Sequence, residues 1–322
     1  MSSPPYHLRT NKAIDRFLFL EILRNVILQK ESQNYCYVSF GGPYLDDFRL
    51  MHEYFPKMEL ISLEKCKDTF KRQKFNKPSG NVQLLNTNMT SYLSNFMPGD
   101  KKYVFWLDYT DLRYSNFEDF KSVLFRIPPG SIVKITLQCE PHLYINKQTD
   151  KLNPDGTFKK DKQLLFAQWF DLVLPNSYSR PPRRRIEFAK LLTKMIRIAS
   201  QQALPRSATT NLFCPILDSF YKDKGGIYTF TGIVTTPSNI TSTKDKLRHL
   251  WYSNLSWRKN PLNIDIPILS TKERLHLQPS LPCNGGELKR LLGYKIGDDS
   301  LKQLKQYSDF YREYPYFIRG II

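Results

Sequence analysis

Residues 35–64 constrain the fold of this chain more than any other segment. The apolar run at 35–40 predicts a buried strand, Gly41-Gly42-Pro43 predicts a turn, and an amphipathic helix then leads to a second strand that ends at Glu64. A strand, a glycine turn, a helix and a strand closed by an acid form the first unit of a nucleotide-binding α/β sheet. The glycines of such a unit let backbone N–H groups approach a ligand, and the acid accepts hydrogen bonds from ribose hydroxyls. The segment therefore predicts a nucleotide-type pocket.

The alternation of strand and helix continues beyond this unit. Near-continuous apolar runs, separated by segments of helical spacing, predict parallel strands at 35–40, 58–63, 82–85, 103–107 and 132–137. Such runs are typical of a parallel sheet covered on both faces, and right-handed crossovers make it doubly wound. Two extended runs, 213–221 and 227–236, flank a short Lys/Gly turn and predict an antiparallel hairpin. We expect an α/β fold with a mostly parallel, seven-stranded sheet that ends in this hairpin.

Composition suggests a sheet domain followed by an extension. We expect residues 1–240 to form the α/β domain, with an insertion near 143–180 that contains an exposed polar stretch at 146–163 and a helix near 161–173. Residues 237–263 are rich in Ser, Thr and Asn, as a linker is, and from residue 264 the pattern becomes helical. Ser270-Thr271-Lys272-Glu273 resembles a capping sequence at a helix start. Residues 241–322 are thus predicted to be a linker and a small, mainly helical extension.

The charge of the chain points to a polyanionic partner. Among 322 residues, 48 are Lys or Arg and 30 are Asp or Glu, which gives a formal net charge of +18. RNA or DNA is the natural partner for such a charge, although a solvated lysine-rich surface would give the same balance. Positive charge at the start of a predicted helix runs against the helix dipole, so the run at 180–185 favours phosphate contact over simple solvation. The predicted nucleic-acid-binding residues are Arg180, Arg183, Arg184 and Arg185.

Cysteine usage and hydropathy bear on metals and compartment. The five cysteines are widely scattered, with no Cys-x-x-Cys pair and no nearby His at ligand spacing. We therefore expect free thiols in a reducing cytosol, with no metal site. No segment approaches the roughly 18 uncharged apolar residues of a membrane-spanning helix, and the N-terminus lacks the apolar run of a signal peptide. The expectation is a cytoplasmic chain with no membrane partner.

Five α/β units followed by an antiparallel hairpin resemble the class I S-adenosylmethionine-dependent methyltransferase superfamily, over about residues 12–236. Dehydrogenase folds share the first unit but continue with a sixth parallel strand, so the hairpin favours the methyltransferase. The resemblance implies S-adenosylmethionine as cofactor, with the glycine turn beneath its methionine part, Glu64 at the ribose and Asn86 or Asn88 near the adenine. The cofactor-binding residues implied are Phe40, Gly41, Gly42, Glu64, Asn86, Asn88 and Asp108.

The chain departs from the family pattern in its first motif. The family usually has acid-x-Gly-x-Gly-x-Gly, and this chain has Val38-Ser39-Phe40-Gly41-Gly42-Pro43-Tyr44. An acid and the third glycine are therefore missing, and Pro43 removes a backbone donor from the turn. An empty, vestigial pocket or another nucleotide ligand is the alternative to S-adenosylmethionine.

No standard methyl-acceptor signature follows the fourth predicted strand. That strand ends in Asp108-Tyr109-Thr110-Asp111, which lacks the paired prolines used in amino-group methylation. Asp108 and Asp111 are the candidate catalytic residues, as a general base and a substrate or metal ligand at the sheet's carboxyl edge. Helix capping and loop solvation would explain both acids equally well.

Three functional hypotheses fit these observations. The first is an S-adenosylmethionine-dependent methyltransferase-like protein that acts on or binds a nucleic acid. The second is a catalytically inactive member of the fold that serves, with protein partners, as a binding or assembly module in a nucleic-acid-processing or antiviral defence complex. The third is a nucleotide-dependent enzyme of another chemistry, such as an NAD-dependent one.

Overall fold

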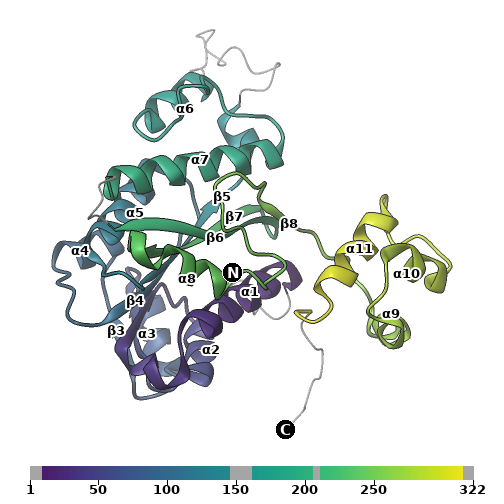
Figure 1. Cartoon of the computed structure of the whole chain (residues 1–322), viewed down its shortest axis with the longest axis horizontal. Helices are drawn as coiled ribbons and strands as arrows, with labels where there is room; N and C mark the ends of the chain where they lie inside the picture. The colour runs from purple at the N-terminus through teal and green to yellow at the C-terminus, as the bar shows by residue number, and fades with distance from the viewer. Residues whose placement is uncertain (1–8, 146–161, 206–210, 315–322) are drawn as a thin grey trace. The chain divides into compact units, whose positions relative to one another are not determined.

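The computed structural model describes residues 9–145, 162–205 and 211–314 (Figure 1). The chain divides into two compact units. The larger, called the sheet unit below, contains Ile22–Phe220 and Gly225–Leu262. The smaller, called the helical unit, contains the described residues of Met1–Glu21, Tyr221–Lys224 and Asn263–Ile322.

The strands form one sheet, in the order β3-β2-β1-β4-β5-β7-β6-β8 (Figure 1). β1 is paired in parallel with β2 and β4, and the pairs β2–β3 and β4–β5 are also parallel. β7 is antiparallel to β5, and β6 and β7 are neighbours joined by residues 223–225, which makes them the predicted hairpin. The α/β prediction is confirmed, and a short eighth strand is added at the edge. The strands are β1 Tyr35–Ser39, β2 Glu59–Leu63, β3 Val82–Leu85, β4 Lys102–Asp108, β5 Ile132–Gln138, β6 Leu212–Lys222, β7 Gly226–Thr235 and β8 Leu262–Ile264.

Helices occupy the segments whose apolar residues recur at helical spacing. Within the described part of the chain, no helix is both long and apolar enough to cross a membrane. The α-helices are α1 Thr10–Val26, α2 Asp46–Tyr54, α3 Lys67–Asn76, α4 Met89–Ser94, α5 Tyr114–Arg126, α6 Lys162–Phe170, α7 Arg185–Ala203, α8 Ile240–Asp245, α9 Thr271–Leu277, α10 Gly285–Leu292 and α11 Ser300–Phe310.

The order of the parallel strands sets where a ligand can bind. From β1 the chain moves outward through β2 to β3, and it then returns to the other side of β1 to form β4 and β5. The crossovers on the two sides of β1 thus run in opposite directions. Such a reversal opens a crevice at the carboxyl ends of the strands, where open α/β sheets bind their ligands.

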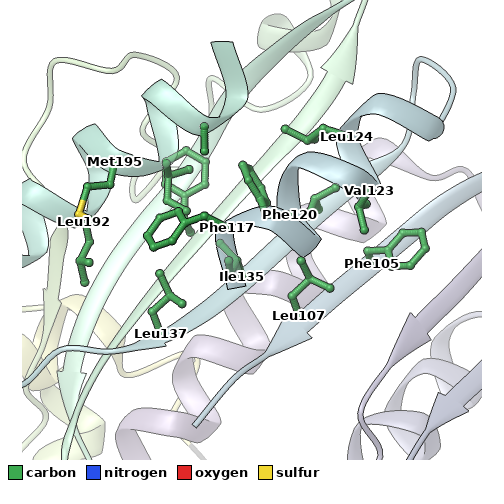
Figure 2. Packing of buried hydrophobic residues seen from close by; sticks show 14 of the residues in the cluster. Phe105, Leu107, Phe117, Phe120, Val123, Leu124, Ile135, Leu137, Leu192 and Met195 are labelled. Atoms are coloured by element: carbon green, nitrogen blue, oxygen red, sulfur yellow. The ribbon is translucent and has the colours of Figure 1, made fainter. Parts of the chain in front are cut away.

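The core of the sheet unit lies between the sheet and helices α5 and α7 (Figure 2). On α5, Phe117, Phe120 and Val123 recur every three residues, so they share the face that meets the sheet. The side chains of α5 pack against alternate residues of β4 and β5, which point to one face of the sheet. They also pack against one face of α7. The side chains that are fully buried in this layer include Phe105, Leu107, Phe117, Phe120, Val123, Ile135, Leu137, Leu192 and Met195.

Residues 240–262 contact the sheet, although their composition is typical of a linker. The amide N of Asn254 donates to the carbonyl of Ile216 at 2.6 Å, and its Nδ2 donates to the Asp218 carboxylate at 2.5 Å. Asp218 is buried in β6, so its carboxylate needs hydrogen-bond donors from within the protein. Asn254 and Thr193 supply them. The predicted division of the chain after residue 240 stays a prediction.

The predicted insertion near 143–180 is described only in part, because residues 146–161 lie outside the described ranges. Its helix α6 places Phe166 and Phe170 in the core, against Tyr144 and Phe188. This helix, in the segment where the sequence predicts one, is therefore a packed element of the sheet unit.

The helical unit contains the predicted capping box. The amide N of Glu273 donates to Ser270 Oγ at 3.2 Å, and the amide N of Ser270 donates to Glu273 Oε2 at 2.6 Å. These reciprocal bonds satisfy two donors at the start of α9. At Gly285 the backbones of α10 and α11 come so close that a Cβ would overlap backbone atoms of Lys305. A glycine is required there for the two helices to pack.

The glycine turn after β1 is held by contacts within the protein. A Cβ on Gly41 would overlap the Leu45 side chain and Ser62 Oγ, so the bare face of this glycine is already filled. Gly42 has a positive φ of 54°, which favours glycine. Its carbonyl accepts a hydrogen bond from Gln73 Nε2 at 2.9 Å, which ties the turn to α3. Contacts within the protein therefore fix this turn without a bound ligand.

Gly41→Ala should therefore destabilise the fold. We expect a loss of about 1–3 kcal/mol in the free energy of unfolding, since the added methyl group overpacks a filled site. Gly99→Ala is the matched control, because a Cβ there meets nothing within 4 Å. Urea denaturation measures both variants. A Gly41→Ala midpoint equal to that of Gly99→Ala would contradict the packing argument.

Candidate active site

A cavity of about 370 Å³ lies where β1, β2 and β4 end. Phe40 follows β1, Glu64 follows β2, and Asp108 is the last residue of β4; all three line the cavity. Asn88 and Asp111 line it too. Five of the residues predicted from the sequence therefore meet in one place, at the reversal of strand order. The volume lies within the range of about 300–1,000 Å³ that is usual for small-molecule sites.

Glu64 presents a carboxylate oxygen to the cavity region. The amide N of Cys66 donates to Glu64 Oε1 at 2.7 Å, which fixes the orientation of the half-buried carboxylate. Asn86 Nδ2 donates to the Glu64 carbonyl at 2.6 Å and thereby holds the backbone. Among the described residues, no group donates a hydrogen bond to Oε2. This oxygen can therefore accept a hydrogen bond from a ligand, and the role of Glu64 at the ribose stays a prediction.

The two predicted asparagines differ in their surroundings. Asn86 is exposed, does not line the cavity, and uses its side chain on the backbone of Glu64. Asn88 lines the cavity and is the N-cap of α4, where its Oδ1 accepts from the amide N of Ser91 at 2.8 Å. Of the two, Asn88 is the one with direct access to a ligand. Gly41 and Gly42 are not among the lining residues, whereas their neighbour Phe40 is.

The two candidate catalytic acids are not equivalent. Asp111 Oδ2 lies 2.7 Å from Arg113 Nε, and Asp111 Oδ1 accepts a hydrogen bond from Asn116 Nδ2 at 3.3 Å. Asp111 is therefore held in place by residues of its own loop and of α5. Asp108 is half-buried at the end of β4 and lines the same cavity.

Tyr109 and Asp119 complete the cavity wall and were not predicted from the sequence. The Tyr109 hydroxyl donates to Asp119 Oδ2 at 2.7 Å, and Thr90 Oγ1 donates to Asp119 Oδ1 at 3.0 Å. Burial, together with the charge of Asp119, raises the pKa of Tyr109 far above its ordinary value. The Tyr109 ring also lies 5.5 Å from that of Phe40. The spacing Asn116-x-x-Asp119 at the start of α5 was the available signal, since residues three apart share a helix face.

Arg185 is bound within the protein. Its Nη2 lies 3.3 Å from Glu140 Oε1, and the same carboxylate accepts a hydrogen bond from the backbone N–H of Gly226. Burial raises the pKa of Glu140, but the Gly226 and Arg185 contacts together outweigh it and leave the pKa below its usual value. A Cβ on Gly226 would overlap the Cys139 carbonyl. This Glu140–Gly226–Arg185 cluster joins the ends of β5, β7 and α7.

Arg180, Arg183 and Arg184 are exposed and do not line the cavity. Of the four predicted arginines, these three leave their charge at the surface before α7, while Arg185 is shared with Glu140. The nucleic-acid interface stays a prediction. Within the described ranges, no group of three or more His, Cys, Asp or Glu side chains has an arrangement that would hold a metal ion.

Solved structures similar to this chain have low sequence identity. A LepI complex with SAM has a TM-score of 0.37 at 10% identity and covers 73% of this chain and 49% of its own. A putative transferase from Pyrococcus horikoshii has a TM-score of 0.37 at 12% identity and covers 67% and 63%. An O-methyltransferase family protein from Burkholderia thailandensis has a TM-score of 0.34 at 10% identity and covers 70% and 59%. This chain thus spans less than two thirds of the length of each.

No protein with curated annotation matches this sequence at a significant level. A family model described as putative O-methyltransferase matches residues 4–322, which is nearly the whole chain. The strand order, with β7 antiparallel to β5 after five parallel strands, agrees with the sheet that the sequence predicted. This chain belongs to that O-methyltransferase family, and its fold is that of the class I S-adenosylmethionine-dependent methyltransferases.

Proposed function

We propose that this chain is an S-adenosylmethionine-dependent O-methyltransferase that binds its cofactor in the cavity at the ends of β1, β2 and β4. One observation carries the proposal. Four separate segments each contribute a residue to the lining of this cavity: Phe40, Glu64, Asn88 and Asp108. The chain also belongs to an O-methyltransferase family. The class I fold of the sheet unit supports the same cofactor.

The residues present fit this cofactor. Glu64 Oε2 offers a charged acceptor for ribose hydroxyls, and Asn88 at the start of α4 supplies amide groups on the adenine side. Phe40, packed on the Tyr109 ring, gives the cavity an apolar wall. The glycine turn supports this wall from behind, because Gly41 is packed against Leu45 and Ser62. Bound in this cavity, S-adenosylmethionine would supply an electrophilic methyl group.

The acids of the cavity suggest how a hydroxyl is activated. We assign Asp108 as the general base: it would accept the hydroxyl proton as the acceptor oxygen bonds to the methyl carbon, while the methyl–sulfur bond breaks and the demethylated cofactor leaves. Asp111 is held by Arg113 and Asn116 and positions the loop that follows β4. Tyr109 keeps its proton at neutral pH because its pKa is raised, so it remains a hydrogen-bond donor to Asp119. The Tyr109–Asp119 pair thus fixes part of the cavity wall.

We further propose that the acceptor belongs to a nucleic acid. The net charge of +18 and the exposed Arg180, Arg183 and Arg184 support a polyanionic substrate. Because O-methylation requires a hydroxyl group, RNA, with its ribose 2′-hydroxyls, suits this family better than DNA. Lys134, the lysine within β5, is fully buried over the Trp106 ring and takes no part in the proposed chemistry.

Glu64→Gln should weaken cofactor binding. Replacing the carboxylate removes charge-assisted hydrogen bonds to the ribose, so we expect the Kd for S-adenosylmethionine and its demethylated product to rise by about 10–100-fold. Isothermal titration calorimetry measures both ligands. Glu53→Gln, an exposed acid of α2, is the matched control and should bind as the wild type does. Absence of heat in the folded wild-type protein would overturn the cofactor proposal.

Asp108→Asn should slow turnover far more than it weakens cofactor binding. A positioned general base contributes about 10²–10⁴-fold, so the rate of labelled methyl transfer to cellular RNA should fall by that factor. Cellular DNA and protein serve as parallel acceptors. If the wild type binds the cofactor but labels none of the three, the chain is the inactive module that the sequence also allowed. If Asp108→Asn transfers at the wild-type rate, Asp108 is not the base.

The double variant Arg183→Gln/Arg184→Gln should bind single-stranded RNA more weakly. Each arginine that no longer neutralises a phosphate should reduce the slope of log affinity against log salt by about 0.7. Fluorescence anisotropy with a labelled RNA of about 20 nucleotides, over a salt series, measures affinity and slope. Lys71→Gln/Lys74→Gln removes the same charge from the exposed face of α3 and should retain the wild-type slope. Equal reductions in the two double variants would argue for a diffuse charge effect.

A further inference from the structure

A second cavity, of about 530 Å³, lies at the other end of the sheet. It is lined by the last turns of α7, the start of β6, the residues after β7, and the loop at 255–258. Ile233 near the end of β7 pairs with Ile132 at the start of β5, whereas the candidate active site lies where β4 and its neighbours end. The two cavities share no lining residue. This space is therefore separate from the proposed cofactor site.

The charge of this cavity is uniformly positive. Arg197, Lys244 and Arg258 line it, and none of the described residues that line it is Asp or Glu. Among the described residues, none of these three side chains forms a salt bridge. Burial raises the pKa of the Cys214 thiol, and the positive charge of Lys244 lowers it by a smaller amount. Both residues line the cavity, so the charge of Lys244 is felt at the cavity wall. Three cations around one concave space, without carboxylate partners, favour an anionic ligand.

The wall of the cavity also contains a fixed aromatic surface. Trp257 is half-buried and stacks on the buried Phe230, with ring centroids 5.2 Å apart and an angle of 13° between the planes. Phe213 lies beside it and lines the cavity as well. Phe230 already holds the indole of Trp257 in place. A flat ligand that stacks on the indole would therefore not have to immobilise this side chain. An aromatic platform beside cations is typical of sites that bind nucleotides or single-stranded nucleic acid.

Polar groups between the platform and the cations add hydrogen-bonding capacity. Gln201 lines the cavity and can both donate and accept. Ser256 Oγ accepts from the amide N of Arg258 at 3.2 Å, which fixes the backbone that carries Arg258. These groups suit a heterocycle with polar edges better than a simple hydrocarbon.

We propose that this cavity binds a nucleoside phosphate, with the base stacked at Trp257 and the phosphate held by Arg197, Lys244 and Arg258. The nucleotide is either free or one unit of a single-stranded RNA. The site is independent of the proposed cofactor cavity, since it shares no residue with it. It would therefore hold its ligand whether or not methyl transfer occurs.

Titration of the full chain with GMP tests the proposal. Guanosine monophosphate is chosen because its base is not adenine, and Glu64→Gln serves as the background that disables the cofactor cavity. Calorimetry at low salt should detect GMP binding that is equal in the wild type and in Glu64→Gln. Guanosine, which lacks the phosphate, should bind at least about tenfold more weakly.

Variants locate the site. Arg197→Gln and Lys244→Gln should each weaken GMP binding by about tenfold, and Trp257→Leu should weaken GMP binding but not the binding of inorganic pyrophosphate. Lys246→Gln, an exposed lysine just after α8 that does not line the cavity, is the control and should bind GMP as the wild type does. Circular dichroism verifies that each variant is folded.

The outcomes separate clearly. No GMP binding by the folded wild type, equal binding of guanosine and GMP, or equal weakening in Lys246→Gln and Lys244→Gln would each overturn the proposal. A short RNA of about ten nucleotides that binds at least about tenfold more tightly than GMP, and that GMP displaces, identifies the ligand as a strand. Comparable affinities identify a free nucleotide. Loss of S-adenosylmethionine binding in Glu64→Gln, with GMP binding retained, keeps the two sites distinct.

Discussion

Burial of the apolar faces of α5 and α7 against β4 and β5 is the interaction on which the rest of the sheet unit depends. Fully burying a large apolar side chain stabilises a fold by about 1.5–3 kcal/mol, and this layer contains many of them. Each of these two helices also carries a polar residue of one cavity. Phe117 and Phe120 face the core while Asp119 lines the candidate active site. On α7, Met195 is buried while Arg197 lines the second cavity.

This arrangement explains which site residues were predictable from the sequence. Glu64 and Asp108 end buried strands, and the carboxyl ends of parallel strands meet at one edge whatever the details of the loops. Asp119 lies inside a helix, where only its tertiary contacts with Tyr109 and Thr90 distinguish it from a solvated acid. Likewise, the arginine run at 180–185 reads as a uniform cluster, and only tertiary contact with Glu140 separates Arg185 from the others. Local patterns predict the ends of elements better than the partners of single side chains.

Glycines illustrate the same limit. A sequence shows that a turn needs Gly41, but it does not show whether a ligand or the protein itself occupies the space beside it. In this chain Leu45 and Ser62 occupy it. The second cavity was beyond sequence reasoning for a related reason: its cations come from α7, from α8 and from the loop at 255–258, and only the folded sheet brings them together. The residues after 240, polar enough to resemble a linker, supply part of that wall.

The bond between Glu140 and the first residue of β7 has a consequence for the hairpin. Side chains alternate between the two faces of a strand, so a slip of one residue would exchange Tyr228 and Phe230 for Thr229 and Thr231. The carboxylate of Glu140 and the amide of Cys139 both bond the backbone of Gly226, and they fix the starting point of β7 against β5. An acid 86 positions earlier in the chain thus helps to set the alignment of β7 on β5. With that alignment, Phe230 stays on the face where it meets Trp257.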